Sequence, residues 1–152
     1  MNVEYINPFT QATFDVLNML GAFSPKIGKL SVKNEPVPSY GVSVIVGVIG
    51  NIKGQIVYSF TEDTARGIAS AMMMGMPVEA FDEMAKSAVS ELANMISGNA
   101  STGIAAKGLE VDISPPTLIT GNNVRITSNV KQTVVVPIET TAGVIEVNIA
   151  VE

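Results

Sequence analysis

Residues 42–60 read VSVIVGVIGNIKGQIVYSF, a run rich in β-branched side chains that a Gly-Asn pair divides into two halves. Val, Ile and Tyr favour extended backbone, and Gly50-Asn51 supplies residues that accept the positive φ angles of a tight turn. The segment therefore predicts an antiparallel hairpin with strands at residues 40–49 and 52–60.

Helices are predicted on both sides of this hairpin. Apolar residues spaced three and four apart indicate a first helix over residues 8–20. Ser59-Phe60-Thr61-Glu62 has the spacing of a capping box and predicts that a second helix follows over residues 63–74. A third, longer helix is predicted from residue 78 or 81 to about residue 106.

The remaining segments are predicted to be extended: residues 29–34, 113–119, 123–128, 131–138 and 144–151. In the last of these, apolar and polar side chains alternate, which is typical of a strand in a sheet with one buried face. The order is one helix, three strands, two helices and then strands. It predicts an α+β fold in which an antiparallel or mixed β-sheet packs against three helices. A chain of 152 residues can bury one core, so we expect one domain over residues 1–152.

The composition of the chain argues against several classes of function. The formal net charge is −5 and the chain has no Lys/Arg run, which argues against a nucleic-acid partner. No apolar stretch approaches the roughly 20 residues of a membrane span, and the first residues lack the basic start of a signal peptide. We therefore expect a cytoplasmic protein that does not enter the membrane. The hydrophobic content of 47% indicates either a large core or apolar surface buried against a second subunit.

The chain contains no Cys and no His. Their absence removes disulfides, thiol nucleophiles, imidazole bases and almost every transition-metal site, so no metal ligand is predicted. Any chemistry must use carboxylates, amides, hydroxyls, amines or backbone groups, or groups that a partner supplies.

The third helix combines an apolar face with a polar stripe. At about 100° per residue, one face gathers the apolar side chains, and a stripe beside that face gathers small and polar residues within an arc of about 60°. The apolar face is predicted to comprise Phe81, Met84, Ala85, Ala88, Leu92, Met95 and Ile96, and the stripe Ser87, Glu91, Asn94 and Gly98. Asn99 falls on the apolar side, where no role is predicted for it.

Glu91 and Asn94 stand three residues apart, so their side chains reach into the same small volume outside the helix. The amide of Asn94 can hold a water at one end and a phosphoryl oxygen or a backbone group at the other. Gly98 weakens a helix by roughly 1 kcal/mol relative to Ala, which is easier to understand if a partner must approach closely there. The alternative is that the stripe is an ordinary solvated flank of the helix.

Residues 87–95, SAVSELANM, resemble the signature of the CheC/CheX/FliY family of chemotaxis response-regulator phosphatases. That signature has a Ser or Asp, a Glu four residues later, an Asn three residues after the Glu, and a Pro about twenty residues further on. Pro115-Pro116 stand near the place of that proline, at a slightly shorter spacing. The segments 56–60, 71–76 and 111–117 also resemble the CheX branch, so the likeness extends over nearly the whole chain.

The resemblance implies a CheC-like fold and hydrolysis of the phosphoryl-aspartate of the response regulator CheY. Asn94 would orient the attacking water, and Glu91 would pair with a Lys of the regulator. Ser87 and Gly98 would lie against the partner. No cofactor is expected on this chain, because Mg²⁺ and the phosphorylated Asp would both belong to the regulator.

The resemblance has two further implications. In the CheC branch the Glu/Asn pair occurs on two helices, so Asp15 and Asn18 in the first helix would be the vestige of a second site. The CheX branch also implies a homodimer whose subunits share a continuous β-sheet.

Other interpretations stay open. The chain could be a non-catalytic binding or scaffold module of the chemotaxis or flagellar switch system. It could also be a structural dimer whose polar stripe is only solvent-exposed surface. Met72, Met73, Met74 and Met76 could contact a partner, since Met adapts to irregular surfaces, although two or three of them are expected to face the core.

Overall fold

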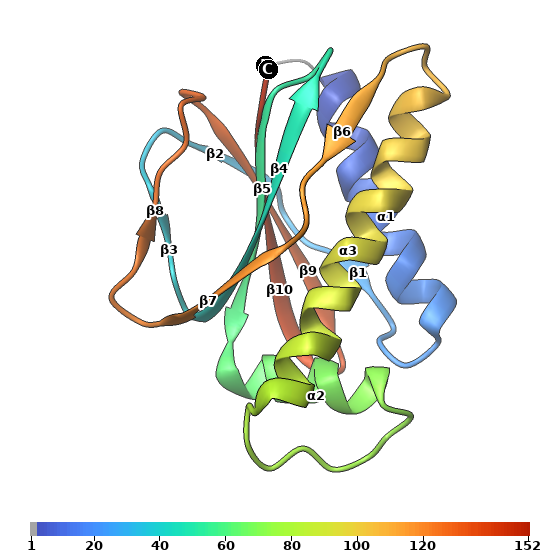
Figure 1. The fold of residues 1–152 in the computed structure, drawn as a ribbon, viewed down its shortest axis with the longest axis vertical. Helices are drawn as coiled ribbons and strands as arrows, with labels where there is room; N and C mark the ends of the chain where they lie inside the picture. Colours follow the sequence, from blue (N-terminus) through green and yellow to red (C-terminus); the bar gives the residue numbers. More distant parts are fainter. Residues whose placement is uncertain (1–2) are drawn as a thin grey trace.

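The computed structural model describes residues 3–152, which form an antiparallel sheet with helices on one face (Figure 1). The helices are α1 (Val3–Leu20), α2 (Glu62–Met72) and α3 (Glu83–Ala105). The strands are β1 (Lys26–Ile27), β2 (Ser31–Lys33), β3 (Val37–Pro38), β4 (Gly41–Gly50), β5 (Gly54–Thr61), β6 (Val111–Ile113), β7 (Thr117–Gly121), β8 (Arg125–Ile126), β9 (Thr133–Thr140) and β10 (Gly143–Val151). The predicted α+β class is confirmed.

The predicted hairpin lies inside the main sheet, between β10 on one side and β6 and β7 on the other. Strands β4 and β5 pair antiparallel, with Val44 opposite Tyr58, and the strand order is β1-β9-β10-β5-β4-β6. Strand β2 also pairs with β9, and β7 with β4. The turn is longer than predicted, because β5 begins at Gly54 rather than at residue 52. Gly54 has a φ of +146°, and a Cβ there would lie 1.9 Å from the carbonyl oxygen of Ala150, so only Gly fits.

Helices α1 and α3 lie side by side over one face of the sheet, and α2 lies at its lower end (Figure 1). Apolar side chains from alternate positions of β4, β5, β9 and β10 meet the helices there in one continuous core. Within the described residues, no helix combines the length and the apolar character that a membrane span requires.

The opposite face of the sheet is partly covered, which the alternation in residues 144–151 did not predict. Strands β3 and β8 form a small second sheet on that side (Figure 1). Val37, Val57 and Ile126 pack together between this small sheet and the main one. Asn148 and Ala150 are therefore buried although they point away from the helices. The amide of Asn148 donates to the carbonyl oxygen of Val57 at 3.1 Å, which offsets the cost of burying it.

The first helix begins at Val3, five residues earlier than predicted, and contains Pro8. Proline has no N–H to donate to the carbonyl oxygen four residues before it, which is that of Glu4. The Lys107 ammonium donates to this oxygen at 3.4 Å. A contact from the turn that follows α3 thus supplies a donor that α1 itself lacks.

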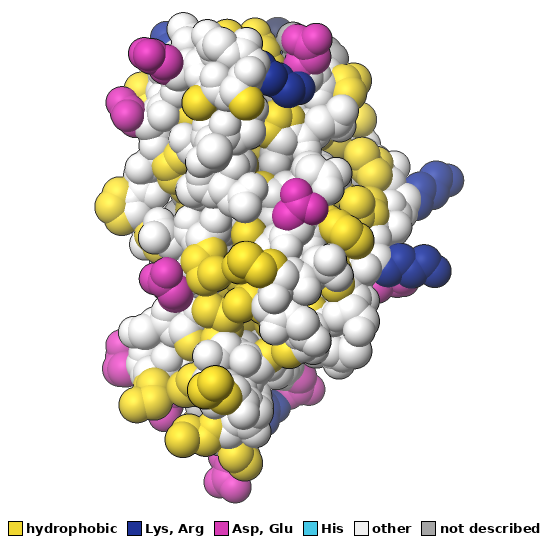
Figure 2. All heavy atoms as spheres, turned by 90° about the vertical axis from the view of Figure 1, so that its right-hand side faces the viewer, with side chains coloured by type: hydrophobic (Ala, Val, Ile, Leu, Met, Phe, Trp, Pro, Cys, Tyr) yellow, Lys and Arg dark blue, Asp and Glu magenta, His cyan; other side chains and the backbone are white. Residues whose placement is uncertain are grey.

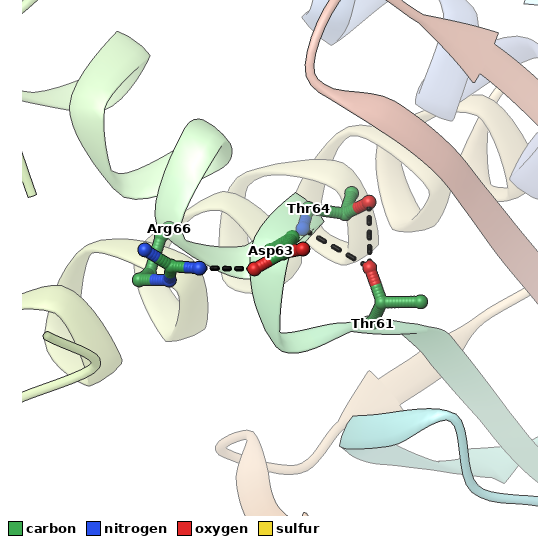
Figure 3. A network of polar contacts seen from close by, with 4 residues as sticks. All are labelled: Thr61, Asp63, Thr64 and Arg66. Atoms are coloured by element: carbon green, nitrogen blue, oxygen red, sulfur yellow. Dashed lines mark hydrogen bonds and ion pairs between the residues drawn. The ribbon is translucent and has the colours of Figure 1, made fainter. Parts of the chain in front are cut away.

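Helix α2 begins differently from the predicted capping box. Its N-cap is Thr61, whose hydroxyl accepts a hydrogen bond from the Thr64 N–H at 3.1 Å and lies 3.0 Å from the Thr64 hydroxyl (Figure 3). Asp63 and Arg66 form an ion pair in the first turn. Ser59, the predicted cap, lies inside β5, where its hydroxyl is buried without a hydrogen-bond partner among the described residues.

Two predicted strands are also wrong in extent. Residues 113–119 are divided into β6 and β7 by Pro115-Pro116, which cannot donate to a ladder. Of residues 123–128 only the two residues of β8 are in a strand. Helix α3 starts at Glu83, later than predicted, because the carboxylate of Asp82 caps it by accepting from the Ala85 N–H at 2.9 Å.

A buried pair of hydroxyls joins α3 to the sheet. Tyr58 of β5 and Ser97 of α3 are almost fully enclosed, and their oxygens lie 2.9 Å apart. Burial raises the pKa of Tyr58 well above its ordinary value, and the hydrogen bond with Ser97 opposes only part of that rise. The phenol is therefore uncharged at neutral pH and can share a hydrogen bond with Ser97.

We expect Tyr58→Phe to lower the free energy of unfolding by about 1–2 kcal/mol, because it leaves the Ser97 hydroxyl buried without this partner. Urea unfolding of the wild type, Tyr58→Phe, Ser97→Ala and the double variant measures the coupling between the two groups. The double variant should lose less than the sum of the single losses. Strictly additive losses would show that the two hydroxyls do not stabilise each other.

Candidate functional site

The buried face of α3 is rotated from the predicted one. The residues that it buries are Ala85, Val89, Leu92, Ala93, Ile96, Ser97, Ala100 and Ile104. At 100° per residue, the centre of this set lies about 90° around the helix from the predicted centre. Met84, predicted to face the core, is exposed, and Ala88 and Met95 are only half-buried. The small side chains of Ala93, Ser97 and Ala100 let the helix approach its neighbours closely, which a search for large apolar residues overlooks.

This rotation moves the polar stripe outward. Ser87, Glu91, Asn94 and Gly98 are all exposed. They lie nearly opposite the buried face of α3, and the prediction that they border that face is wrong. Their common direction is therefore toward solvent, away from the sheet.

Glu91 and Asn94 are free to meet a partner. Within residues 3–152, neither side chain makes a hydrogen bond or an ion pair. Their Cβ atoms are neighbours at the roughly 5–6 Å that a three-residue spacing sets. A carboxylate that accepts only and a carboxamide that both donates and accepts are thus presented together on a rigid helix.

Gly98 has no packing role within the chain. A Cβ at this position would meet no atom within 4 Å, and the φ of Gly98 is not in the positive range. One turn further on, the Thr102 hydroxyl donates to the Gly98 carbonyl oxygen at 3.2 Å. The fold of this chain therefore gives no reason for a glycine there.

Asp15 and Asn18 are also exposed, on α1. The Asp15 carboxylate accepts a hydrogen bond from the Gln11 amide at 2.8 Å, so it is engaged within its own helix, unlike Glu91. Asp15 lies in a groove of about 610 Å³ between α1, the end of α3 and strand β1. Asn99 lines the same groove and is exposed, although it was predicted to lie on the apolar side of α3.

The family model described as "Chemotaxis phosphatase CheX" matches residues 42–139 of this chain. The match includes all but the first residue of β4, and the whole of β5, α2 and α3, and therefore Glu91 and Asn94. The chain belongs to the CheX family of chemotaxis phosphatases.

Individual relatives support this family assignment. The chain is 33% identical over 128 residues to the CheY-P phosphatase CheX of Thermotoga maritima, covering 84% of this chain and 83% of that protein. A CheC-like superfamily protein of Shewanella sp. PV-4 has the same fold, with a TM-score of 0.88 at 30% identity, over 100% of this chain and 99% of that one. The predicted CheC-like fold is confirmed.

A CheX from Borrelia burgdorferi has been solved as a CheX-CheY-BeF3-Mg complex. It superimposes with a TM-score of 0.82 at 35% identity, over 99% of both chains. A member of this family thus binds CheY in the presence of beryllofluoride and magnesium.

We expect Gly98→Ala to raise the free energy of unfolding of the isolated CheX-family chain by up to about 1 kcal/mol, because Ala favours a helix and its methyl group meets only open space. Thermal or urea unfolding would measure the change. A loss of stability would show that the glycine serves the fold of the chain itself.

Proposed function

We propose that this chain hydrolyses the phosphoryl-aspartate of a CheY-type response regulator. The observation that carries the proposal is the exposed, unpaired Glu91 and Asn94 on one face of α3, in a chain of the CheX family. The Thermotoga maritima relative is a CheY-P phosphatase, and the Borrelia burgdorferi relative binds CheY. We also propose that the activity is cytoplasmic.

In the proposed reaction, the oxygen of a water attacks phosphorus in line with the acyl oxygen of the regulator's Asp. The bond between phosphorus and that acyl oxygen breaks, and the products are inorganic phosphate and the Asp carboxylate. Asn94 positions the water, since a carboxamide is too weak a base to remove its proton but can hold it by hydrogen bonding. Positioning can supply much of the rate, because phosphoryl transfer needs little covalent help from the protein.

Glu91 has a different role in this proposal. Its carboxylate pairs with a Lys of the regulator, which fixes the regulator's active site against α3 and aligns Asn94 with the phosphoryl group. Mg²⁺ stays on the regulator and neutralises charge on the phosphoryl oxygens. Ser87 and Gly98 lie one turn on either side of the pair, where their small size lets the partner's backbone approach.

The second pair, Asp15 and Asn18, contributes little in this proposal. Asp is one methylene shorter than Glu, and the Gln11 amide already occupies the Asp15 carboxylate. We regard it as the vestige of a second site.

Asn94→Ala should lower the rate of phosphate release from phosphorylated regulator with Mg²⁺ by about 100-fold or more, because the water loses its positioning group. Asn99→Ala is the matched control, since it removes the same exposed side chain from the same helix, on the side of the groove beside α1. It should leave the rate unchanged. Full activity in Asn94→Ala would refute the role of Asn94, and wild-type protein that binds the regulator without speeding hydrolysis would indicate a non-catalytic module.

The chain is also proposed to form a homodimer through an edge of its sheet. Strands β1 and β2 lie at the edge beside β9, where Ile27, Leu30 and Val32 are exposed. Val32 is 57% exposed on an edge strand, a position that soluble monomers usually protect with charge. A second copy would bury these side chains and extend the sheet.

Light scattering should report twice the mass of the chain for the wild type and the mass of one chain for Leu30→Lys/Val32→Lys, because two charges would oppose pairing at the edge. Circular dichroism would check that the variant is folded. A monomeric wild type, or a dimer that persists in the folded variant, would exclude this interface.

A further inference from the structure

An exposed apolar surface lies where the loop between α2 and α3 meets the start of α3. Met73, Met76 and Met84 border a shallow hollow of about 340 Å³ together with Pro77 and Val78. We call these three residues the methionine surface. Met73 is half-buried and fixes one side of the hollow, whereas Met76 and Met84 are 60% and 66% exposed. Figure 2 shows hydrophobic side chains gathered toward this lower end of the helix-covered side.

The methionine surface is continuous with the proposed site. Met84 lies seven residues before Glu91 on the same helix, so two turns bring both side chains to nearly the same direction. The distance along the helix axis is about 10 Å at 1.5 Å per residue. Ser87, between them, is small and exposed, so no large side chain of this stripe separates the methionines from Glu91.

A protein partner centred on Glu91 and Asn94 must reach this surface. A standard interface covers about 800 Å² on each partner, which corresponds to a disc about 16 Å in radius. Met84 lies well inside that radius. We propose, on the basis of the proposed function, that the methionine surface docks the response regulator by receiving an apolar patch next to the regulator's phosphorylation site.

The charged residues around the hollow indicate which side chains surround the apolar patch of the partner. Glu79 and Asp82 line the hollow, and Glu83 is exposed beside it. In the described part of the chain, the nearest cation on α3 is Lys86, which is paired with Glu83 at 3.4 Å. Because the hollow is apolar and its rim is acidic, it would fit a partner patch that is apolar at its centre and has Lys or Arg at its margin.

Methionine suits a surface that binds a transient partner. Its unbranched, polarisable side chain adapts to an irregular contact, and apolar contact at the rim of a site adds affinity without taking part in the reaction. The methionine surface would therefore set how tightly the regulator is held, while Glu91 and Asn94 set how fast its phosphoryl group is lost.

The experiment compares wild type with Met76→Gln/Met84→Gln, which keeps side-chain length but makes both exposed positions polar. Rates are measured against the concentration of phosphorylated regulator, and binding is measured with the regulator carrying beryllofluoride and Mg²⁺. We expect KM and Kd to rise about tenfold or more, because two apolar contacts are lost. At saturation kcat should stay within about twofold, because the reacting groups are untouched.

Two controls isolate the apolar contact. Val144→Gln also makes an exposed apolar side chain polar, but Val144 alternates with the core residue Ile145 and so lies on the sheet face turned away from the helices. It should leave KM and Kd unchanged. Met76→Leu/Met84→Leu stays apolar and should keep both constants close to those of the wild type.

Unchanged KM and Kd in the folded Gln variant would overturn the proposal. It would also be overturned if light scattering showed that the Gln variant loses a dimer while its Kd for the regulator is preserved, since the surface would then cover a second copy of the chain. Failure of the proposed function is distinguishable, because it would show as a wild type that does not speed hydrolysis, while the beryllofluoride titration still measures docking.

Discussion

The hydrogen bond between Tyr58 and Ser97, together with the apolar side chains that α3 buries around it, fixes how α3 is turned about its own axis. Two buried hydroxyls must face each other, since either one alone would lose its hydrogen bond to water without replacement. Small residues on either side of Ser97 let α3 pack closely against its neighbours. With Ser97 turned inward, Glu91 and Asn94 point to the opposite side of the helix. A rotation of the helix by one residue would bury part of the stripe and expose part of the core. The outward presentation of the pair is therefore a property of the core as much as of the surface.

The buried and exposed faces of α3 have different roles. Its inward face uses Val, Leu, Ile and Ala to attach the helix to the sheet and to α1, and its outward face presents Glu91 and Asn94, which have no side-chain partner among residues 3–152. Unpaired surface groups on a rigid helix lower the stability of the fold only a little, and they need not rearrange when a partner binds. That arrangement suits a CheX-family chain whose proposed substrate is another protein carrying both the phosphoryl group and the metal ion.

Much of the fold could be predicted because strong local patterns agreed with the tertiary structure. The hairpin of β4 and β5, the long helix and strand β10 follow from β-branched runs, helical spacing and strict alternation. The errors arose where tertiary contacts decided the outcome. Alternation could not show that β3 and β8 bury Asn148, and the spacing of Ser59 and Glu62 could not show that β5 continues to Thr61. For the site, the stripe was predictable from spacing, but its direction was not, because polar Ser97 proved to be core and apolar Met84 proved to be surface.

The most direct test of the account is a structure of this chain bound to a CheY-type regulator that carries beryllofluoride and Mg²⁺. The account predicts that the carboxamide of Asn94 lies opposite the beryllofluoride, on the side from which a water would attack, with Glu91 against a Lys of the regulator. A regulator bound to α1 or to the sheet face away from the helices, with Asn94 still in solvent, would contradict it.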